Sequence, residues 1–428
     1  MKKELIISYE DDASKIALIE DGRLFELHEI KQNTDFVVGD IFVGKIKKLA
    51  PNLNAAFVNI GYEKDAFLHY QDLGPQYLTY RKFLQDTVSK RQQTSSLKNF
   101  QIQPEIDKHG TVDKVIAAQD EVLLQITKEP ISTKGPRIST QISLTGRFLV
   151  LIPFDNKVSI SKKVKSAEEK ARLKTLIESI KPEGFGVIIR TVAEGKKVAE
   201  LHNDMNQLVD KWNVCFKNIQ KNKTPAKVLS EEDKASAILR DNFNQDFVSI
   251  ICDDEQMVND MKNYLEVIAP ERKNIVQFYD SHIPLLEYYN VEKQLKQSFG
   301  KHVNIPSSKG AYLVIEHTEA LHVVDVNSGN NISSGTANKE HALNVNKMAA
   351  TEIARQLRLR DMGGIIVVDF IDMPNPDHRK DLYEHLREEM KRDKAKHKIL
   401  PPSKFGLIQI TRQRVRPEKQ IDTTEENP

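Results

Sequence analysis

The chain has 428 residues, with 63 Lys and Arg against 61 Asp and Glu, so its formal net charge is only +2. This length is long for one domain and predicts two to four folded units. No apolar run approaches the ~18 residues that span a bilayer and no signal-peptide pattern opens the sequence, so we expect a soluble cytoplasmic protein.

The two cysteines, Cys215 and Cys252, lack a CxxC spacing. This excludes a disulfide framework and a cysteine zinc site, and we expect both to be small apolar residues in a reducing compartment. The small net charge conceals two basic segments, residues 131–174 and 387–416, each with ten basic and three acidic side chains. Such segments favour a polyanionic partner, although a charged run is more often only a solvated face.

Residues 1–34 predict a β-hairpin. The segments ELIISY and KIALIEDGRLFELHEI are rich in β-forming residues, and Asp21-Gly22 is a strong hairpin turn. Because a lone hairpin is not stable in water, it must pair with strands from later in the chain.

From Val37 to about residue 130 the pattern changes to short strands and glycines, which is typical of a small OB-type barrel. In such barrels exposed aromatic side chains stack on unpaired bases, and nearby lysines contact phosphates. Phe57 and Phe67 are candidates for this role, but their spacing fits ordinary core residues equally well. A polar stretch from Gly74 to Gly110 interrupts the strands, and we expect a flexible or partly helical loop insertion there.

Residues 131–214 read as a second module that begins with the first basic segment. Arg190 and Thr191 follow the apolar run VII at the end of a predicted strand. A guanidinium beside a hydroxyl suits phosphate binding, and a structural ion pair for Arg190 explains the pattern equally well. Residues 196–227 predict a helix, with Trp212 and Phe216 buried, and a Lys-rich connector.

Residues 236–300 alternate helix and strand, and this α/β lobe is the natural partner of the N-terminal hairpin. The barrel and the basic module would then be inserted into the lobe. Near the end of the chain we expect a helix at about 379–392, a last strand within FGLIQITRQRV and a polar tail.

The segment 310–373 carries the most informative pattern. It predicts a hairpin of strands 312–315 and 321–326, and then a helix whose apolar residues recur every three or four positions from Ala342 to Leu357. The apolar run 365–368 is typical of a strand buried on both faces. Asp325 lies in the hairpin and Asp369 follows this run, so the crossover helix would place them on neighbouring strands although 44 residues separate them.

Two adjacent carboxylates, with Asn327 beside the first, most simply require a hard divalent cation. Magnesium binds oxygen ligands and leaves positions for water and substrate phosphate, which suits metal-assisted phosphodiester hydrolysis. The alternative is structural: Asp325 would cap the following loop, and Asp369 would pair with a buried Arg or Lys. For either aspartate alone the structural alternative is favoured, and the convergence of three polar groups favours the metal site.

The segments DVNSG, EIARQLRLRDMGGIIVVDFIDM and KFGLIQITRQR resemble the bacterial ribonuclease E/G family. NAAFVNIG and AFLH resemble that family's RNA-binding OB domain, and ISLTGRFLVL and IIRT resemble its 5′-sensor domain. Each motif is short, but their order and spacing hold along nearly the whole chain.

The resemblance implies a multidomain α/β fold. An RNase H-like lobe would comprise residues 1–35 and 226–300, with an OB-fold domain at 36–130, including the loop insertion 74–110, and a 5′-sensor domain at 131–225 inserted into it. A DNase I-like catalytic domain would occupy 301–416, and 417–428 would be a polar tail.

The resemblance also implies site residues, position by position. Asp325 and Asp369 match the family's catalytic, magnesium-binding aspartates, and Asn327 matches the asparagine that helps to hold the active site. The 5′-phosphate sensor would comprise Gly146, Val150, Arg190, Thr191 and Lys396, and RNA contacts would come from Phe57, Phe67, Lys134, Lys162 and Lys163. Lys162, Lys163 and Lys396 stand where the family usually has arginine, and because lysine lacks the planar fork we expect weaker RNA affinity or 5′-end discrimination.

Two departures from the family pattern affect these expectations. The insertion 74–110 is longer than expected, which leaves the RNA path across that face of the barrel open. The family also carries a CPxC-like pair through which two chains share a zinc, and then a small oligomerisation domain. This sequence contains neither, as in a truncated form or in a form that dimerises differently. We therefore expect no zinc site in this chain, and a homodimer would use other surfaces.

The implied function is a Mg²⁺-dependent endoribonuclease, with Mn²⁺ as an alternative metal. It would cut single-stranded RNA, such as rRNA and tRNA precursors and mRNA, to leave 5′-phosphate and 3′-hydroxyl ends, and a 5′-monophosphate would stimulate it. The main alternative is a non-catalytic RNA-binding or ribosome-maturation scaffold, against which the retained Asp325, Asn327 and Asp369 argue. A DNA-directed phosphodiesterase is disfavoured only by the resemblance.

Overall fold

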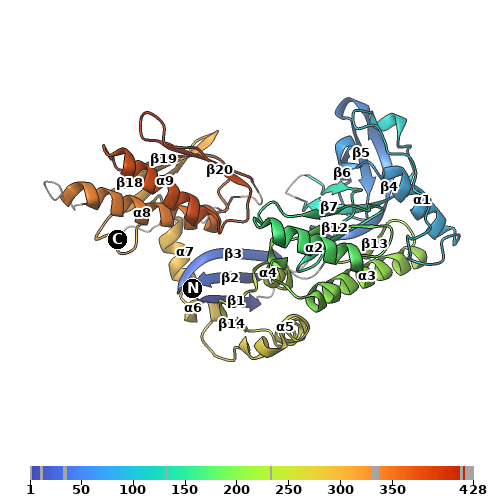
Figure 1. Cartoon of the computed structure of the whole chain (residues 1–428), viewed down its shortest axis with the longest axis horizontal. Coiled ribbons are helices and arrows are strands. Elements are labelled where there is room, and N and C mark those ends of the chain that lie inside the picture. The colour runs from blue at the N-terminus through green and yellow to red at the C-terminus, as the bar shows by residue number, and fades with distance from the viewer. Residues whose placement is uncertain are drawn as a thin grey trace. The chain divides into compact units, whose positions relative to one another are not determined.

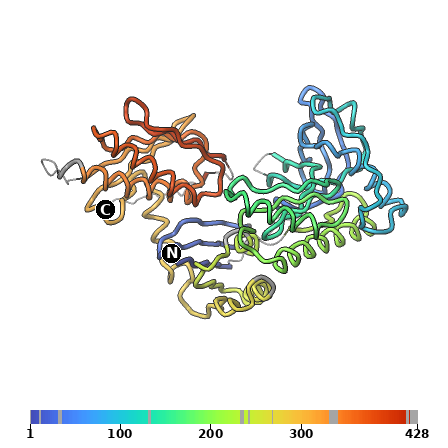
Figure 2. The backbone as a smooth tube through the Cα atoms, in the orientation of Figure 1, coloured from blue at the N-terminus to red at the C-terminus, as the bar shows by residue number. Residues whose placement is uncertain are grey.

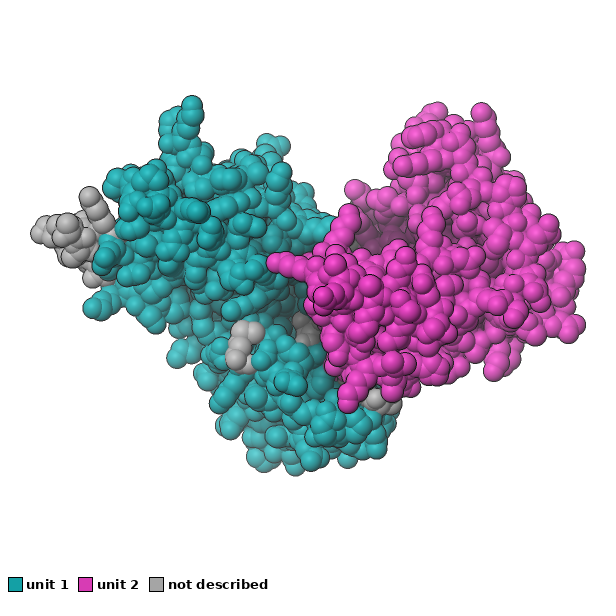
Figure 3. All heavy atoms as spheres, viewed as in Figure 1, with its two compact units in different colours: residues 1–32, 243–428 teal, residues 33–242 magenta. Residues whose placement is uncertain are grey.

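The structure is a computed structural model that describes residues 2–9, 13–31, 36–130, 134–231, 234–329, 337–414 and 418–419 (Figures 1 and 2). The chain divides into two units, coloured separately in Figure 3. Unit 1 comprises Met1–Gln32 and Phe243–Pro428, and unit 2 comprises Asn33–Asn242. Among the described residues, each unit contains two β-sheets.

The N-terminal hairpin belongs to the first sheet of unit 1, called here the lobe sheet. Its strand order is β15-β14-β1-β2-β3, with β1 (Lys3–Tyr9), β2 (Ala13–Glu20), β3 (Arg23–Lys31), β14 (Phe247–Cys252) and β15 (Val276–Phe278). β1 runs parallel to β14, which is the pairing predicted for the hairpin. Asp21 and Gly22 form the predicted turn between β2 and β3, with φ of 47° and 77°, and glycine adopts such values without a Cβ penalty.

The second sheet of unit 1, called here the carboxylate sheet, has six strands in the order β16-β17-β18-β19-β21-β20. The strands are β16 (His302–Asn304), β17 (Tyr312–His317), β18 (Leu321–Asn327), β19 (Gly364–Asp369), β20 (His397–Ile399) and β21 (Ile408–Arg412). The helices of unit 1 are α5 (Glu255–Ile268), η5 (Pro270–Ile275), α6 (Leu285–Tyr288), α7 (Val291–Phe299), α8 (Ala337–Leu359) and α9 (Pro376–Met390). The predicted hairpin, crossover helix and following strand are therefore all present.

One face of the carboxylate sheet is buried and the other is open. Apolar residues of α8 and α9, such as Val345 and Leu386, share one core with Val324 and Ile366 of the sheet. The prediction that strand 365–368 is buried on both faces is wrong, because Ile365 is 41% exposed. Both helices cover the same face, so alternate residues of each strand point away from the core.

A buried ion network at the end of α8 ties the two sheets of unit 1 together. Arg355 donates to both oxygens of Glu352, at 2.7 Å for the shortest contact, and to the Leu24 carbonyl of β3 at 2.6 Å. One turn later, Arg358 contacts Glu20 at 3.0 Å and Glu26 at 2.9 Å, both on the lobe sheet. The arginines of the segment EIARQLRLR therefore contact carboxylates and a carbonyl of the lobe sheet.

Unit 2 contains a closed five-stranded barrel, consistent with an OB-fold, as predicted. The barrel strands run β4-β5-β6-β8-β7 and close through β4 and β7, and β13 adds to the edge of β4. The elements are β4 (Ile41–Ala50), β5 (Ala55–Asn59), β6 (Ala66–His69), β7 (Glu121–Lys128), β8 (Arg137–Ser139), β13 (Ala226–Leu229), η1 (Pro51–Leu53), η2 (Tyr70–Asp72) and η3 (Val112–Lys114).

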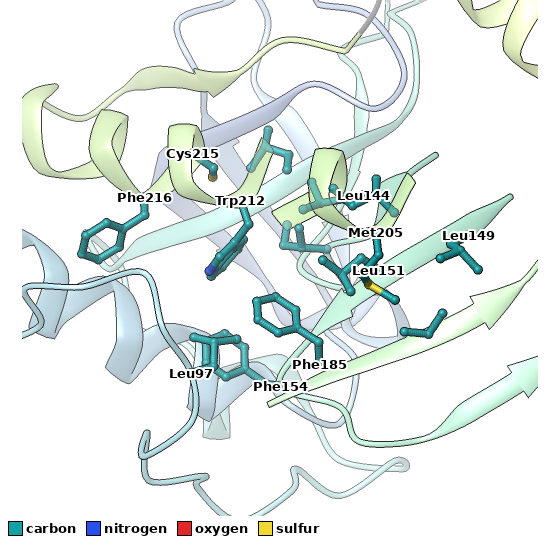
Figure 4. Packing of buried hydrophobic residues seen from close by; sticks show 14 of the residues in the cluster. Leu97, Leu144, Leu149, Leu151, Phe154, Phe185, Met205, Trp212, Cys215 and Phe216 are labelled. Carbon is teal, nitrogen blue, oxygen red and sulfur yellow. The ribbon is translucent and has the colours of Figure 1, made fainter. Parts of the chain in front are cut away.

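The second sheet of unit 2 has the strand order β11-β12-β10-β9. Its strands are β9 (Leu144–Thr145), β10 (Leu149–Pro153), β11 (Val158–Ile160) and β12 (Phe185–Ile189), and the unit's helices are α1 (Tyr77–Val88), α2 (Ala167–Ile180), η4 (Thr191–Ala193), α3 (Val198–Lys221) and α4 (Lys234–Asn242). Trp212 of α3 lies against Phe154 and Phe185 in the core (Figure 4). Trp212 and Phe216 are buried, as predicted.

The insertion 74–110 is better anchored than the sequence indicated. Its helix α1 contributes Tyr80, Phe83 and Leu84 to the same core as Trp212, and Leu97 follows from the segment after the helix. The Phe83 and Trp212 rings are stacked, with centroids 5.4 Å apart. The partly helical alternative is therefore the one observed, and the insertion forms part of the packing of unit 2.

Three smaller predictions also bear on the fold. Cys215 and Cys252 are free and buried, and burial raises the pKa of each thiol to about 12. No helix in the described ranges is both long and apolar enough to cross a membrane. The fold is mixed α/β, and the names RNase H-like, DNase I-like and 5′-sensor for its parts stay predictions.

The ion network gives a stability prediction. Glu352→Ala should lower the free energy of unfolding by about 3–5 kcal/mol, because it leaves the buried Arg355 without its carboxylate. Arg355, Arg23 and Gln356 outweigh burial and hold the pKa of Glu352 below its usual range. The contribution is therefore complete above about pH 4.3, the ordinary value for Glu, and is lost as the pH falls from there through the folded-state pKa.

Chemical denaturation of wild type, Glu352→Ala and Glu384→Ala would measure the effect. Glu384 is an exposed glutamate on α9, so its substitution should change the free energy of unfolding by less than about 0.5 kcal/mol. Equal stability of the Glu352 and Glu384 variants would contradict the role given to the network.

Candidate functional site

The pairing of β18 with β19 brings Asp325 and Asp369 together. The two strands are parallel, and their register places Asp325 directly beside Asp369, on strands that lie about 4.8 Å apart. Both carboxylates are exposed and alternate with the buried residues of their strands, so they lie on the open face. The structure thus brings together the two predicted aspartates, on a face that the sequence reading had expected to be covered.

Asn327 completes the predicted trio. Its Nδ2 atom donates a hydrogen bond of 2.7 Å to Oδ2 of Asp325, two residues earlier on the same face of β18. The amide therefore restrains the orientation of the Asp325 carboxylate and adds a third polar group to the open face.

The electrostatics of this pair fit a bound cation. Partial burial, and then the charges of Asp325 and Asp372, raise the pKa of Asp369. Within the described part of the chain, neither Asp325 nor Asp369 forms an ion pair with a basic side chain, so the structural alternative of a buried Arg or Lys beside Asp369 finds no partner there. Adjacent oxygen ligands with uncompensated charge are what a hard divalent ion such as Mg²⁺ binds.

A buried amide that the sequence reading missed holds the chain behind Asp369. Asn346 of α8 donates to the Ile371 carbonyl at 2.8 Å and accepts from the Ile371 amide at 3.0 Å. These two bonds fix the backbone two residues after Asp369. The sequence feature that could have indicated this role is the position of Asn346, a polar residue next to Val345 on the apolar stripe of the predicted helix.

Phe57, Phe67 and Lys134 line one groove of about 760 Å³ on the barrel. Phe57 of β5 is the direct cross-strand partner of Phe67 of β6, and their ring centroids are 5.8 Å apart. Both rings are half-buried and lie outside the barrel core, so neither is an ordinary core residue. Lys128 and Arg137 add further cations to the wall of the groove.

The predicted sensor residues of unit 2 meet at the turn between β9 and β10. Arg190 follows β12, and its Nη1 atom donates to the carbonyls of Gly146 at 2.8 Å and Arg147 at 3.3 Å. Val150 lies beside this turn on β10, paired with Ile188 of β12. The structure therefore brings Gly146, Val150 and Arg190 into one small region.

A second missed residue, Asp204 of α3, organises this turn. Its carboxylate accepts hydrogen bonds from the amides of Arg147, Phe148 and Leu149 at 2.9–3.0 Å. A Cβ at Gly146 would lie only 2.7 Å from the Asp204 oxygens, so the turn requires glycine there. Burial raises the pKa of Asp204, with the three amides and Arg190 opposing the rise.

The remaining predicted contacts are more exposed. Thr191 shares a hydrogen bond of 2.7 Å with the Ser161 hydroxyl, and Lys162 and Lys163 follow Ser161 with exposed side chains. Lys396 is exposed before β20 and belongs to unit 1, whereas the other sensor residues belong to unit 2. Lys162 and Lys163 are thus near Thr191 in the fold, and the grouping of Lys396 with them stays a prediction.

One further group of side chains in the described chain has the composition of a metal site. His317 and His322 are cross-strand partners on β17 and β18, and their ligand atoms and a carboxylate oxygen of Glu418 lie within 4.8 Å of one another. Burial, and to a smaller extent His317 and Arg414, lower the pKa of His322, and the positive charge of Arg414 opposes a cation there. The prediction that the chain has no zinc site stays untested.

Residues 143–415 match the Ribonuclease E/G family. The chain is 35% identical to a ribonuclease E of Nostoc over 97% of its length, and 32% identical to the ribonuclease G of Haemophilus influenzae over 96%. The ribonuclease G of Escherichia coli is 31% identical over 97% of the chain.

The chain spans 56% of the Nostoc protein's length and about four-fifths of each ribonuclease G, 80% and 81%. The family match covers both the turn at Gly146 with Arg190 and the aspartate pair on β18 and β19. The chain therefore belongs to the ribonuclease E/G family.

Proposed function

We propose that the chain is a Mg²⁺-dependent endoribonuclease that hydrolyses single-stranded RNA. The direct pairing of Asp325 with Asp369 on the open face of the carboxylate sheet carries this proposal. The names of the relatives, ribonuclease E and ribonuclease G, support RNA as the substrate. A purely RNA-binding scaffold has no need for two adjacent carboxylates that repel each other.

The side chains at the site have distinct roles in this proposal. Asp325 and Asp369 would hold the ion, and Mg²⁺ bound by one or two carboxylates can also bind water and an RNA phosphate. Asn327 restrains Asp325, and Asn346 fixes the backbone behind Asp369. Bound Mg²⁺ (or Mn²⁺) would lower the pKa of a water and stabilise charge on the phosphate oxygens. Attack of the water oxygen on phosphorus would break the P–O3′ bond, so that the phosphate stays on the 5′ end of one product and O3′ takes up a proton to become the 3′-hydroxyl of the other.

The barrel groove supports the proposed preference for unpaired RNA. The half-exposed rings of Phe57 and Phe67 offer faces on which unpaired bases stack, and Lys134, with the neighbouring cations, offers contacts to phosphates. Bases in a duplex are already stacked and paired, so they cannot use these rings. The stacking faces accept any base, which fits substrates as varied as rRNA and tRNA precursors and mRNA in the cytoplasm.

The turn at Gly146 supports a 5′-phosphate sensor. Arg190 contacts the Asp204-held turn, Thr191 follows it and bonds to Ser161, and the basic Lys162 and Lys163 follow Ser161; together they offer cations and a hydroxyl to a terminal phosphate. The preference for a monophosphate over a triphosphate follows from the family resemblance. We include Val150 and Lys396 in this sensor on the family resemblance, and a homodimer as its assembly.

Asp369→Asn should abolish cleavage without unfolding the protein. Loss of a metal-binding carboxylate should exceed the roughly 10- to 100-fold loss typical of removing a residue that only supports a ligand. Because the substitution removes repulsion between adjacent carboxylates, the melting temperature should stay the same or rise. Single-turnover cleavage of an A/U-rich RNA, RNA binding and thermal melting would be compared with Asp280→Asn, an exposed aspartate of unit 1. Lower melting temperature together with lost RNA binding would identify Asp369 as structural.

Arg190→Ala should remove the preference for a 5′-monophosphate. The ratio of cleavage rates for 5′-monophosphate and 5′-triphosphate forms of one RNA should fall toward one, while the rate for 5′-hydroxyl RNA stays near wild type. Arg190→Lys should recover part of the ratio, since lysine keeps the charge and loses the fork. Arg172→Ala, an exposed arginine on α2, is the control. An equal loss on all three RNAs would mean that Arg190 only supports the fold.

A further inference from the structure

A pocket of about 840 Å³ opens where β19 ends, at the residues that follow Asp369. Residues 370–374, the first turns of α9 and the segment 401–406 line it. β19 runs antiparallel to β21, with Val368 paired to Ile408, so the residues after Asp369 and those before Ile408 meet at one edge of the sheet. The lining residues Phe370, Ile371 and Asp372 directly follow Asp369 in the chain. The pocket therefore begins one residue after a proposed metal ligand.

Phe405 at the rim of this pocket is 87% exposed, the largest exposed fraction of any large hydrophobic side chain in the described residues. The turn that carries it is well defined. The Ser403 hydroxyl accepts from the amides of Phe405 and Leu407, each at 3.2 Å, and the Gly406 amide donates to the Ser403 carbonyl at 3.0 Å. Gly406 has φ of +85°, which favours glycine. The hydrogen bonds thus fix the backbone of the turn, and the turn presents the ring to solvent.

Cationic side chains flank the ring. Lys404 precedes Phe405 on the turn, and Lys380 of α9 lines the pocket; both are exposed. Arg379 has a structural role instead, because its guanidinium donates to the carbonyls of the pocket residues Met373 and Pro374. Lysine is depleted in the cores of protein interfaces, whereas an exposed aromatic ring beside lysines is typical of surfaces that bind single-stranded nucleic acid.

We propose that this pocket binds one unpaired nucleotide of the RNA next to the cleaved phosphodiester, with the base stacked on Phe405 and the adjacent phosphate contacted by Lys380 and Lys404. The inference rests on the proposed function for the position of the cleaved bond. It assigns to unit 1 its own base-binding subsite, in addition to the barrel groove of unit 2. Phe405 positions the RNA and takes no part in the bond-breaking step.

Stacking can be observed without cleavage. A short unstructured A/U-rich RNA with 2-aminopurine at one position, moved along the chain in a series, would be bound in EDTA so that it stays intact. The fluorescence of 2-aminopurine falls when the base stacks. We expect one position at which wild type quenches the signal and Phe405→Ala does not. Phe405→Tyr should restore quenching, and Phe278→Ala, which removes a 47% exposed ring on β15, should leave it unchanged.

Cleavage provides the second measurement. With Mg²⁺, Phe405→Ala should weaken single-turnover kcat/KM by roughly 5- to 150-fold, the range for loss of one base-stacking contact. An abasic nucleotide at the position found by fluorescence should produce a similar loss in wild type and little further loss in Phe405→Ala. At other positions the abasic nucleotide and Phe405→Ala should act independently, so the two fold-losses in kcat/KM should multiply.

The outcomes separate this inference from the proposed function. Quenching that depends on Phe405, in a protein that does not cut RNA with Mg²⁺, would keep the subsite and overturn the nuclease proposal. Wild-type cleavage and quenching by Phe405→Ala at every position would overturn the subsite. The exposed ring would then belong to a protein-binding surface.

Discussion

The register between β18 and β19 places two carboxylates side by side, although they repel each other. Contacts of α8 within unit 1 hold the segments that carry them. Parallel pairing of these strands requires the crossover through α8, and α8 in turn supplies Asn346 to hold the backbone beyond Asp369. The far end of α8 is fixed by the buried contacts of Glu352 and Arg355 with the lobe sheet. A rigid helix therefore keeps the repelling aspartates from separating, which is the condition for a cation to bind them together.

In unit 2, too, a buried polar side chain of a long helix holds the backbone of a distant segment. There a single buried carboxylate, Asp204, gathers three backbone amides and a guanidinium at one turn. The result is a turn held at three backbone amides, with Arg190 bound to its carbonyls. In both units a buried polar residue of a long helix holds the backbone of a segment that contains proposed site residues or directly follows one.

The aspartate pair could be predicted from the sequence because strand, helix and strand had strong and distinct periodicities, and Asp325 and Asp369 stood at their ends. The open face of the carboxylate sheet could not be predicted from the sequence. The residues 365–368 of β19 are all apolar, and such a run fits a strand covered on one face as well as a strand covered on both. The role of α1 was missed because only the fold shows that Tyr80 and Phe83 join a distant core. Asn346 and Asp204 were missed for a related reason. The backbone groups that each of them binds lie far away in the sequence.

Analysis of the cleavage products would show whether the aspartate pair holds a metal for RNA hydrolysis. One unstructured A/U-rich RNA would be incubated with the full chain in Mg²⁺ and in EDTA, beside a DNA oligomer of the same sequence. We expect cleavage of the RNA and not of the DNA, and only in Mg²⁺. The products should have 5′-phosphate and 3′-hydroxyl ends. Equal cleavage in EDTA, or products with a 2′,3′-cyclic phosphate, would contradict it, because such ends arise from attack by the RNA's own hydroxyl and not by water.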